Sequence, residues 1–142
     1  MPNTDNTSLK ALPAVGRLLL AAIFIISALG KLAAPGVTQG YIASAGLPFP
    51  VLSYAGAVLV ELGGGLMLLL GLRTRFAAIV LAIFSIVAAA IFHHALGDQN
   101  QFVHFMKNLA IAGGLLQVAA FGAGSFSLDN RAGSTRTRRV TA

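Results

Sequence analysis

The stretch Val58–Gly71, VLVELGGGLMLLLG, is apolar throughout except for one carboxylate, Glu61, near its middle. Apolar residues continue in both directions, from Val51 to Leu72. A run of this length can cross the hydrocarbon core of a bilayer, which takes roughly 20 apolar residues in a helix. The stretch therefore predicts a membrane-spanning helix that carries an acid at its centre, where a charge is costly.

The composition of the whole chain indicates the same class of protein. Of 142 residues, 56% are hydrophobic and only 10% are charged, whereas soluble domains carry about 25% charged residues. The chain has no cysteine, which excludes disulfides, thiol catalysis, iron–sulfur ligation and cysteine-based zinc sites. The net charge of +6 is concentrated at segment boundaries, so it favours membrane orientation over nucleic-acid binding.

Four segments are long and apolar enough to span a bilayer, at about residues 13–32, 51–72, 76–93 and 102–122. The first resembles a signal peptide, but its leading residues carry little positive charge and three more spans follow, so we expect it to be retained. We predict an all-α integral membrane four-helix bundle over residues 13–124. A cytoplasmic segment (1–12) precedes it, and a basic, disordered tail (125–142) follows it. The first connection, near VTQGYIASAG, predicts a short interfacial helix that ends at Gly46.

Lysine and arginine flank the four spans unequally, which predicts that both termini lie in the cytoplasm. One side holds only Lys31 and Lys107. The other side holds the remaining eight basic residues, namely Lys10, Arg17, Arg73, Arg75, Arg131, Arg136, Arg138 and Arg139. At the cytoplasmic boundary we expect Arg17, Arg73, Arg75 and Asp129 to pair with one another and to anchor the helices.

The acid of the second span lies on a small, polar face. Helical spacing places Tyr54, Ala57, Glu61, Gly64 and Gly65 on roughly one side of the helix. Small residues let helices approach closely in a membrane, so this face should meet another helix and not lipid.

Axial depth predicts Lys107 of the fourth span as the partner of Glu61. At 1.5 Å per residue, Lys107 lies roughly 7 Å from the midplane, whereas Lys31 and Arg17 each lie roughly 10 Å away. Glu61 is then half of a buried ion pair or a neutral acid that donates a hydrogen bond. The pair fixes the register of the bundle, or it handles a ligand or a proton.

Further polar residues gather in the outer half, where His104, Lys107 and Asn108 share one helix face and His93 and His94 end the third span. The histidines are interpreted as interfacial aromatics or as contacts to a quinone or another substrate. Haem or metal ligation is disfavoured, because adjacent histidines point about 100° apart on a helix, and we predict no metal site.

The sequence also resembles the DoxX family of small bacterial membrane proteins. The resemblance rests on GRLLLAAIFIISALGKL, AGLPFP, VELGGGLMLLLG followed by RTR, IFHH, FMKNLAIAGGLL and GAGSFSLD, and it extends from about Gly16 to Asp129. It implies a four-helix inner-membrane protein. It also implies a redox association, since related DoxD-type proteins are subunits of a thiosulfate:quinone oxidoreductase. The positions that match the family motif are Arg17, Lys31, Glu61, Lys107 and Asn108.

These observations favour a quinone-linked membrane subunit with a polar pocket in the outer half of the bundle. Glu61 and Lys107 are the candidate catalytic residues, and the candidate cofactor-binding residues are Lys31, Asn108, His93, His104 and Tyr54. Because the chain has no cysteine, the electrons would have to come from a partner protein or a soluble reductant. Two alternatives stay open: a carrier for a small anion or weak acid, which would need a homo-oligomer, and a scaffold without catalysis that recruits a partner protein.

Overall fold

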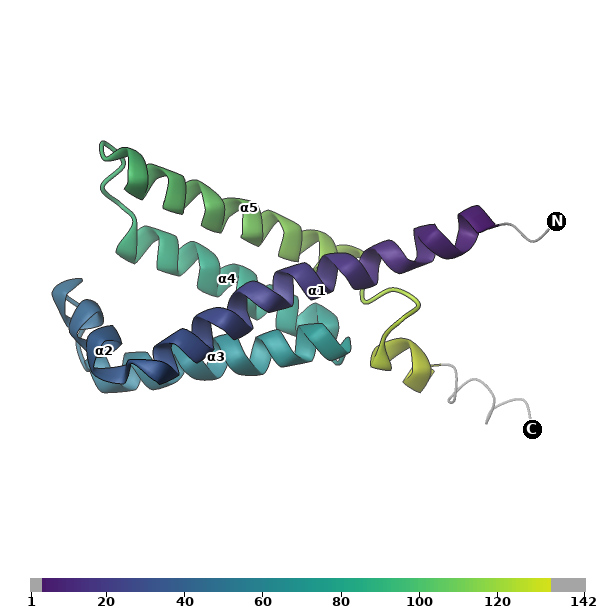
Figure 1. Ribbon diagram of the computed structural model, residues 1–142, viewed down its shortest axis with the longest axis horizontal. Helices are drawn as coiled ribbons and strands as arrows, with labels where there is room; N and C mark the ends of the chain where they lie inside the picture. Colours follow the sequence, from purple (N-terminus) through teal and green to yellow (C-terminus); the bar gives the residue numbers. More distant parts are fainter. Residues whose placement is uncertain (1–3, 134–142) are drawn as a thin grey trace.

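The structure, a computed structural model, describes residues 4–133 and is built from α-helices. Its five main helices are α1 (Thr4–Ala33), α2 (Pro35–Ser44), α3 (Pro50–Leu70), α4 (Thr74–Phe92) and α5 (Gln99–Phe121) (Figure 1). Residues 128–133 add a short helical segment, and no strand occurs in the described part of the chain. Helices α3, α4, α5 and the part of α1 from Ser8 onward are each long and apolar enough to cross a membrane. The prediction of an all-α protein with four spans is therefore confirmed.

Local sequence signals explain where most helices begin. Pro35 and Pro50 each occupy the first position of a helix, where a missing N–H costs nothing. Asp98 precedes α5, and its Oδ1 accepts a hydrogen bond from the amide of Gln101 at 2.9 Å, as an N-cap does. Helix α2 confirms the predicted short helix of the first connection, and Gly46 follows it in the left-handed conformation.

The predicted start of the first helix at residue 13 is wrong. Helix α1 begins at Thr4 and continues through Pro13, whose ring removes one intrahelical hydrogen bond. A helix of 30 residues retains enough other hydrogen bonds to pass through that position. Pro13 packs against the chain at Gly124, where an added Cβ would lie 2.7 Å from the Cβ of the proline.

The helices form two pairs, with α1 along α3 and α4 along α5, joined where α3 contacts α4. Figure 1 shows that the pairs converge toward one end and diverge toward the other. We call the first the closed end (the α3–α4 turn, residues 71–73, and residues 122–133). The other is the open end (α2 and the α4–α5 turn, residues 93–98). The hydrophobic core lies toward the closed end and consists of Ala21, Phe24, Leu68, Ala78, Leu81, Ala82, Ala112 and Leu115.

Two adjacent glycines of α3 allow this close packing. A Cβ added to Gly65 would lie 2.9 Å from Cγ1 of Ile25 on α1, and one added to Gly64 would lie 2.9 Å from Leu81 on α4. Both distances are shorter than real Cβ contacts, so the α3 backbone approaches its two neighbours only because these residues lack side chains.

Arg17 ties α1 to the closed end through carbonyl groups. Its guanidinium donates to the carbonyl oxygens of Leu68 at 2.8 Å and Leu69 at 3.4 Å, and also to that of Phe126. The side chain is only 2% exposed. The last carbonyls of a helix have no partner within the helix. Arg17 therefore supplies hydrogen bonds to the last carbonyls of α3 and holds the segment after α5 beside them.

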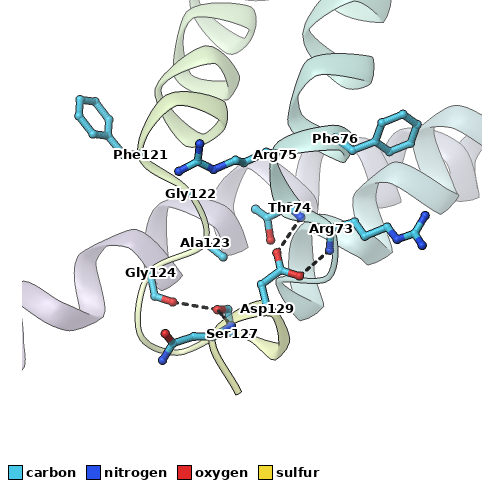
Figure 2. Close-up of a pocket in the computed structure, with 11 residues that line it drawn as sticks. Arg73, Thr74, Arg75, Phe76, Phe121, Gly122, Ala123, Gly124, Ser127 and Asp129 are labelled. Atoms are coloured by element: carbon cyan, nitrogen blue, oxygen red, sulfur yellow. Dashed lines mark hydrogen bonds between the residues drawn. The ribbon is translucent and has the colours of Figure 1, made fainter. Parts of the chain in front are cut away.

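Asp129 binds main-chain groups of the α3–α4 turn. Its carboxylate accepts hydrogen bonds from the amides of Arg73 at 2.7 Å and Thr74 at 2.9 Å, and its own amide donates to the carbonyl of Gly71 at 2.9 Å (Figure 2). Burial, the largest influence, raises the pKa of Asp129. The hydrogen bonds from Thr74 and Arg73 and the charge of Arg17 outweigh burial, so the net pKa lies below its ordinary value.

These contacts correct two predictions about the closed end. The expected ion pairs among Arg17, Arg73, Arg75 and Asp129 are not formed, because left-handed backbone at Gly71 and Arg73 presents main-chain amides to the carboxylate. The tail was predicted to be disordered from residue 125, yet residues 128–133 are helical and Asp129 is bound to the turn. Residues 134–142 of that predicted tail lie outside the described residues.

We expect Gly71→Ala to destabilise the protein. Gly71 has φ +66°, and an added Cβ would lie 2.5 Å from Cβ of Ser127 and 2.6 Å from Nη1 of Arg17. The left-handed conformation alone costs a non-glycine residue about 1–3 kcal/mol. Equilibrium unfolding in mixed micelles should show the loss, whereas Gly63→Ala, a helical position with open space around it, should be neutral or slightly stabilising. Equal stability of the two variants would contradict this account of the turn.

The low pKa of Asp129 predicts a pH-dependent contribution to stability. A carboxyl whose pKa is lower in the folded state stabilises the fold above its unfolded pKa, and this contribution is lost as the pH falls toward the folded value. The difference in Tm between wild type and Asp129→Asn in detergent should be largest at neutral pH and should shrink in acid, below the ordinary carboxyl pKa. A difference that stays constant across this range would show that the charge of Asp129 does not stabilise the closed end.

Candidate functional site

Glu61 lies within α3 and is bound by two side chains of α1, Ser27 and Lys31. The ammonium of Lys31 lies 3.0 Å from Oε1 and 2.8 Å from Oε2 of Glu61. Ser27 donates to Oε1 at 3.0 Å and accepts from Lys31 Nζ at 2.7 Å. Since Ser27 and Lys31 are four residues apart, they project from the same face of α1. The three side chains form a closed polar network between two membrane-spanning helices.

The two charges of this network differ in their access to the surroundings. The Glu61 side chain is 6% exposed and that of Lys31 is 24% exposed. Lys31 also occupies the last turn of α1, where a cation interacts favourably with the helix dipole. Tyr54 donates to the carbonyl of Lys31 at 3.3 Å, which fixes the end of α1 against α3. Lys31 is therefore the accessible end of the network, and Glu61 lies behind it.

The prediction that Lys107 pairs with Glu61 is wrong. Lys107 is exposed on α5, and α5 packs mainly against α4, whereas α3 packs against α1. Axial depth compares distances along the membrane normal but says nothing about which helices are neighbours. The flexible stem of Lys31 covers the difference in depth that had counted against it. Lys31 and Glu61 thus form an ion pair between α1 and α3, with 2.8 Å from Nζ to Oε2.

The network forms the polar wall of a cavity of about 520 Å³ between the two helix pairs. The side chains around it come from all five main helices. Most are apolar or aromatic, and they include Ile23, Phe24, Ile42, Val60, Phe84, Ile91, Phe92 and Ile111. The polar ones, besides Ser27, Lys31 and Glu61, are Thr38, Tyr41, Ser53, Ser85, His93 and Asn108. Sites for small ligands are commonly apolar cavities of this size with a few polar groups.

The structure brings some predicted site residues to this cavity and not others. Lys31, Glu61, His93 and Asn108 line it. Lys107, Tyr54 and His104 do not line it. Tyr54 and His104 instead contact residues that do, Lys31 and His93. The ring of His104 stacks on that of His93 at 5.0 Å between centroids, and the carbonyl of His104 accepts from the Asn108 side chain at 3.0 Å.

The histidines form hydrogen bonds at the open end. Nδ1 of His93 lies 2.8 Å from Oε1 of Gln101, and Nδ1 of the exposed His94 lies 2.9 Å from the carbonyl of Ile91. No cluster of three metal-ligating side chains occurs among residues 8–133, whose side chains the structure describes. The arrangement positions His93 and Asn108 as hydrogen-bonding groups on the cavity wall opposite α1.

Sequence reasoning missed Ser27 and Tyr41, as well as the polar cavity residues Thr38, Ser53 and Ser85. Ser27 bridges the ion pair, and its spacing of four residues before Lys31 was the available signal. Tyr41 of α2 stacks on Phe92 at the end of α4, with ring centroids 5.2 Å apart and planes inclined by 21°. This contact joins α2 to α4 beside the cavity, and a sequence-local signal for it does not exist.

We expect Lys31→Met to destabilise the protein, because it leaves Glu61 buried without its cation. Loss of one partner of a fully buried pair costs roughly 3–5 kcal/mol. We expect about 2 kcal/mol because Glu61 can take up a proton instead. Unfolding in mixed micelles should show this loss, and Lys31→Met combined with Glu61→Met should recover most of it. Lys107→Met is the matched control and should change stability by less than about 0.5 kcal/mol. A larger loss of stability for Lys107→Met than for Lys31→Met would support Lys107, and not Lys31, as the partner of Glu61.

Comparison with known proteins places the chain in a family. The DoxX family model matches residues 12–94, which include Ser27, Lys31 and Glu61. The chain is similar to inner membrane protein YqjF of Escherichia coli (strain K12), with 37% identity over 115 residues that cover 81% of this chain and 87% of the relative. It is also similar to inner membrane protein YphA of the same organism, with 34% identity over 122 residues that cover 82% and 87%.

No solved structure matches this chain. The family match covers more than half of the sequence, both relatives are aligned over most of their length, and four helices can span the membrane. The chain therefore belongs to the DoxX family and is a multi-pass inner-membrane protein.

Proposed function

We propose that this protein binds a quinone headgroup in the cavity beside Lys31 and serves as a quinone-linked membrane subunit. The observation that carries the proposal is the position of the buried network of Ser27, Lys31 and Glu61 in the wall of a largely apolar cavity of about 520 Å³. Intramembrane ionisable residues are expensive and are commonly functional. A network that only joined two helices would not need to adjoin a cavity.

The side chains around the cavity suit the chemistry of a quinone. A quinone ring is planar and apolar and carries two carbonyl acceptors, so it needs aromatic or aliphatic walls and a few donors. Phe84, Phe92 and Ile111 supply such walls, and Lys31 and Asn108 supply donors. When bound, a quinone supplies a two-electron acceptor that takes up protons on reduction.

The residues of the network then have separate tasks. Lys31, the more exposed member, donates a hydrogen bond to a carbonyl oxygen and favours negative charge there. Glu61 orients Lys31 through the ion pair, and its carboxylate can take up a proton and pass it on through Ser27 and Lys31. Lys107 has no part in this scheme because it is exposed on α5. The electrons come from a partner protein or a soluble reductant, because the chain has no cysteine with which to carry them.

We also propose that both termini face the cytoplasm. Eight of the ten lysines and arginines belong to the side that holds the termini, which is the asymmetry of the positive-inside rule. The start of α1 and residues 128–133 lie toward the same end of the bundle (Figure 1). In this orientation, the cavity lies in the outer half of the membrane and the closed end lies at the inner boundary.

The test is saturable binding of a short-chain ubiquinone or menaquinone analogue to the protein in nanodiscs. We expect Lys31→Met to weaken binding by about tenfold or more, the effect of losing a charge-assisted hydrogen bond. Glu61→Gln should weaken it as well, and Lys107→Met should leave it unchanged.

A second variant separates binding from folding. Ala88→Phe enlarges a side chain that lines the cavity on α4 and leaves the ion pair intact, so it should reduce binding without the instability of Lys31→Met. Organic extraction of gently purified protein, followed by mass spectrometry, should recover quinone from wild type and less from Ala88→Phe. Wild-type protein without saturable binding, or with binding that neither variant weakens, would exclude this function.

A further inference from the structure

A second cavity, of about 670 Å³, lies at the closed end between the start of α4 and the end of α5. Figure 2 shows Arg75 between Phe121 and Phe76, with its guanidinium directed toward the end of α5. The guanidinium passes over Gly122, where an added Cβ would lie 3.5 Å from both Nε and Nη2. Arg73 extends away from it on the other side of Thr74. This cavity is separate from the one beside Lys31 and shares no lining residue with it.

The charges around this cavity do not neutralise one another. Among the lining residues that the structure describes, Asp129 alone is acidic, and the hydrogen bonds of its carboxylate come from the amides of Arg73 and Thr74. Neither guanidinium of Arg73 or Arg75 has an ion-pair or hydrogen-bond partner among residues 8–133, whose side chains the structure describes. The lining side chains therefore carry two positive charges against one negative charge, which favours an anionic ligand.

The rim of the cavity is apolar on both sides. Phe76 is 62% exposed and Phe121 is 82% exposed, and both belong to membrane-spanning helices, α4 and α5. Their rings lie at the ends of the spans, where the headgroups of a bilayer meet its hydrocarbon core. An unpaired arginine flanked by two exposed phenylalanines at this level matches a ligand with an anionic head and an apolar body.

We propose that this cavity binds an anionic phospholipid, with the headgroup phosphate on Arg75 and an acyl chain against Phe76 and Phe121. Guanidinium groups bind phosphate through two parallel hydrogen bonds, and interfacial arginines attract anionic lipids. Asn130, which also lines the cavity, adds a polar group on the headgroup side. Arg73 also lines the cavity, and its charge adds to the local positive field although its guanidinium extends away from Arg75. This inference does not depend on the proposed quinone site.

The experiment is native mass spectrometry of the protein released from vesicles of equal parts phosphatidylglycerol and phosphatidylethanolamine. Wild type should retain phosphatidylglycerol in preference to phosphatidylethanolamine. Arg75→Gln should lose about fivefold of this preference, and Arg73→Gln should lose less. Lys10→Gln is the matched control, because it removes the same charge from an exposed position on α1 near this end, and it should retain the wild-type preference.

Two further measurements identify the ligand and the role of Arg75. Inorganic phosphate at millimolar concentration should not displace the lipid, since it lacks the apolar part; full displacement would assign the site to free phosphate and overturn the proposal. Added phosphatidylglycerol should raise the Tm of wild type in detergent and raise that of Arg75→Gln less.

Two results would contradict lipid binding at this cavity. If Arg75→Gln retained phosphatidylglycerol as wild type does, the guanidinium would not be the headgroup contact. If Arg75→Gln lowered the Tm relative to wild type by the same amount with and without the lipid, Arg75 would only stabilise the end of α5. Lys31→Met should keep the lipid preference, so failure of the quinone site would not affect this outcome.

Discussion

A carboxylate buried inside a membrane protein must be protonated or matched by a cation, and this constraint determines how α1 and α3 sit against each other. Glu61 is matched by Lys31, with Ser27 as a third member of the network. The match requires the end of α1 to lie beside the middle of α3, and Gly65 permits the approach because a larger residue would clash with Ile25. The same placement leaves the polar network beside the cavity and not inside the core.

Polar side chains have different partners at the two ends of the bundle. At the closed end, Arg17 and Asp129 bind main-chain carbonyls and amides that helix ends leave without partners. These contacts join α1, the α3–α4 turn and the segment after α5, and the hydrophobic core lies near them. Toward the open end, the pairs diverge and side chains bind other side chains, as in the stack of His93 on His104. The rigid contacts and the candidate site are thus separated along the membrane normal.

The fold was predictable from the sequence because a bilayer imposes a simple rule on length and polarity. Four apolar segments gave four spans, and the small residues beside Glu61 correctly indicated a face that meets another helix. The partner of Glu61 was not predictable by the same means, since depth along the normal does not define which helices are neighbours. Lys107 matched in depth but projects from α5, whereas Lys31 reaches Glu61 through a long stem. The first span was expected from about residue 13, yet α1 begins at Thr4 and continues through Pro13.

The contacts of Asp129 were unpredictable for a related reason. They depend on the left-handed backbone at Gly71 and Arg73, and Arg73 gives no sequence signal for that conformation. The polar and basic composition of the tail, residues 125–142, predicts disorder. Two main-chain amides and the guanidinium of Arg17 nevertheless give its first residues a fixed place. Among the site residues, Tyr41 meets Phe92 only because α2 folds back to α4, a contact between residues 51 positions apart in the chain.

The hydrogen bonds of Arg17 have a consequence for biosynthesis. Its acceptors at Leu68 and Phe126 are 51 and 109 residues further along the chain. Because translation proceeds from the N-terminus, the first span enters the membrane before any of these carbonyls exists. The guanidinium must stay in the headgroup layer, where water can solvate it, until α3 arrives. Its last acceptor, Phe126, is synthesised only after the fourth span, so the residues that follow this span complete the contacts that hold the bundle together.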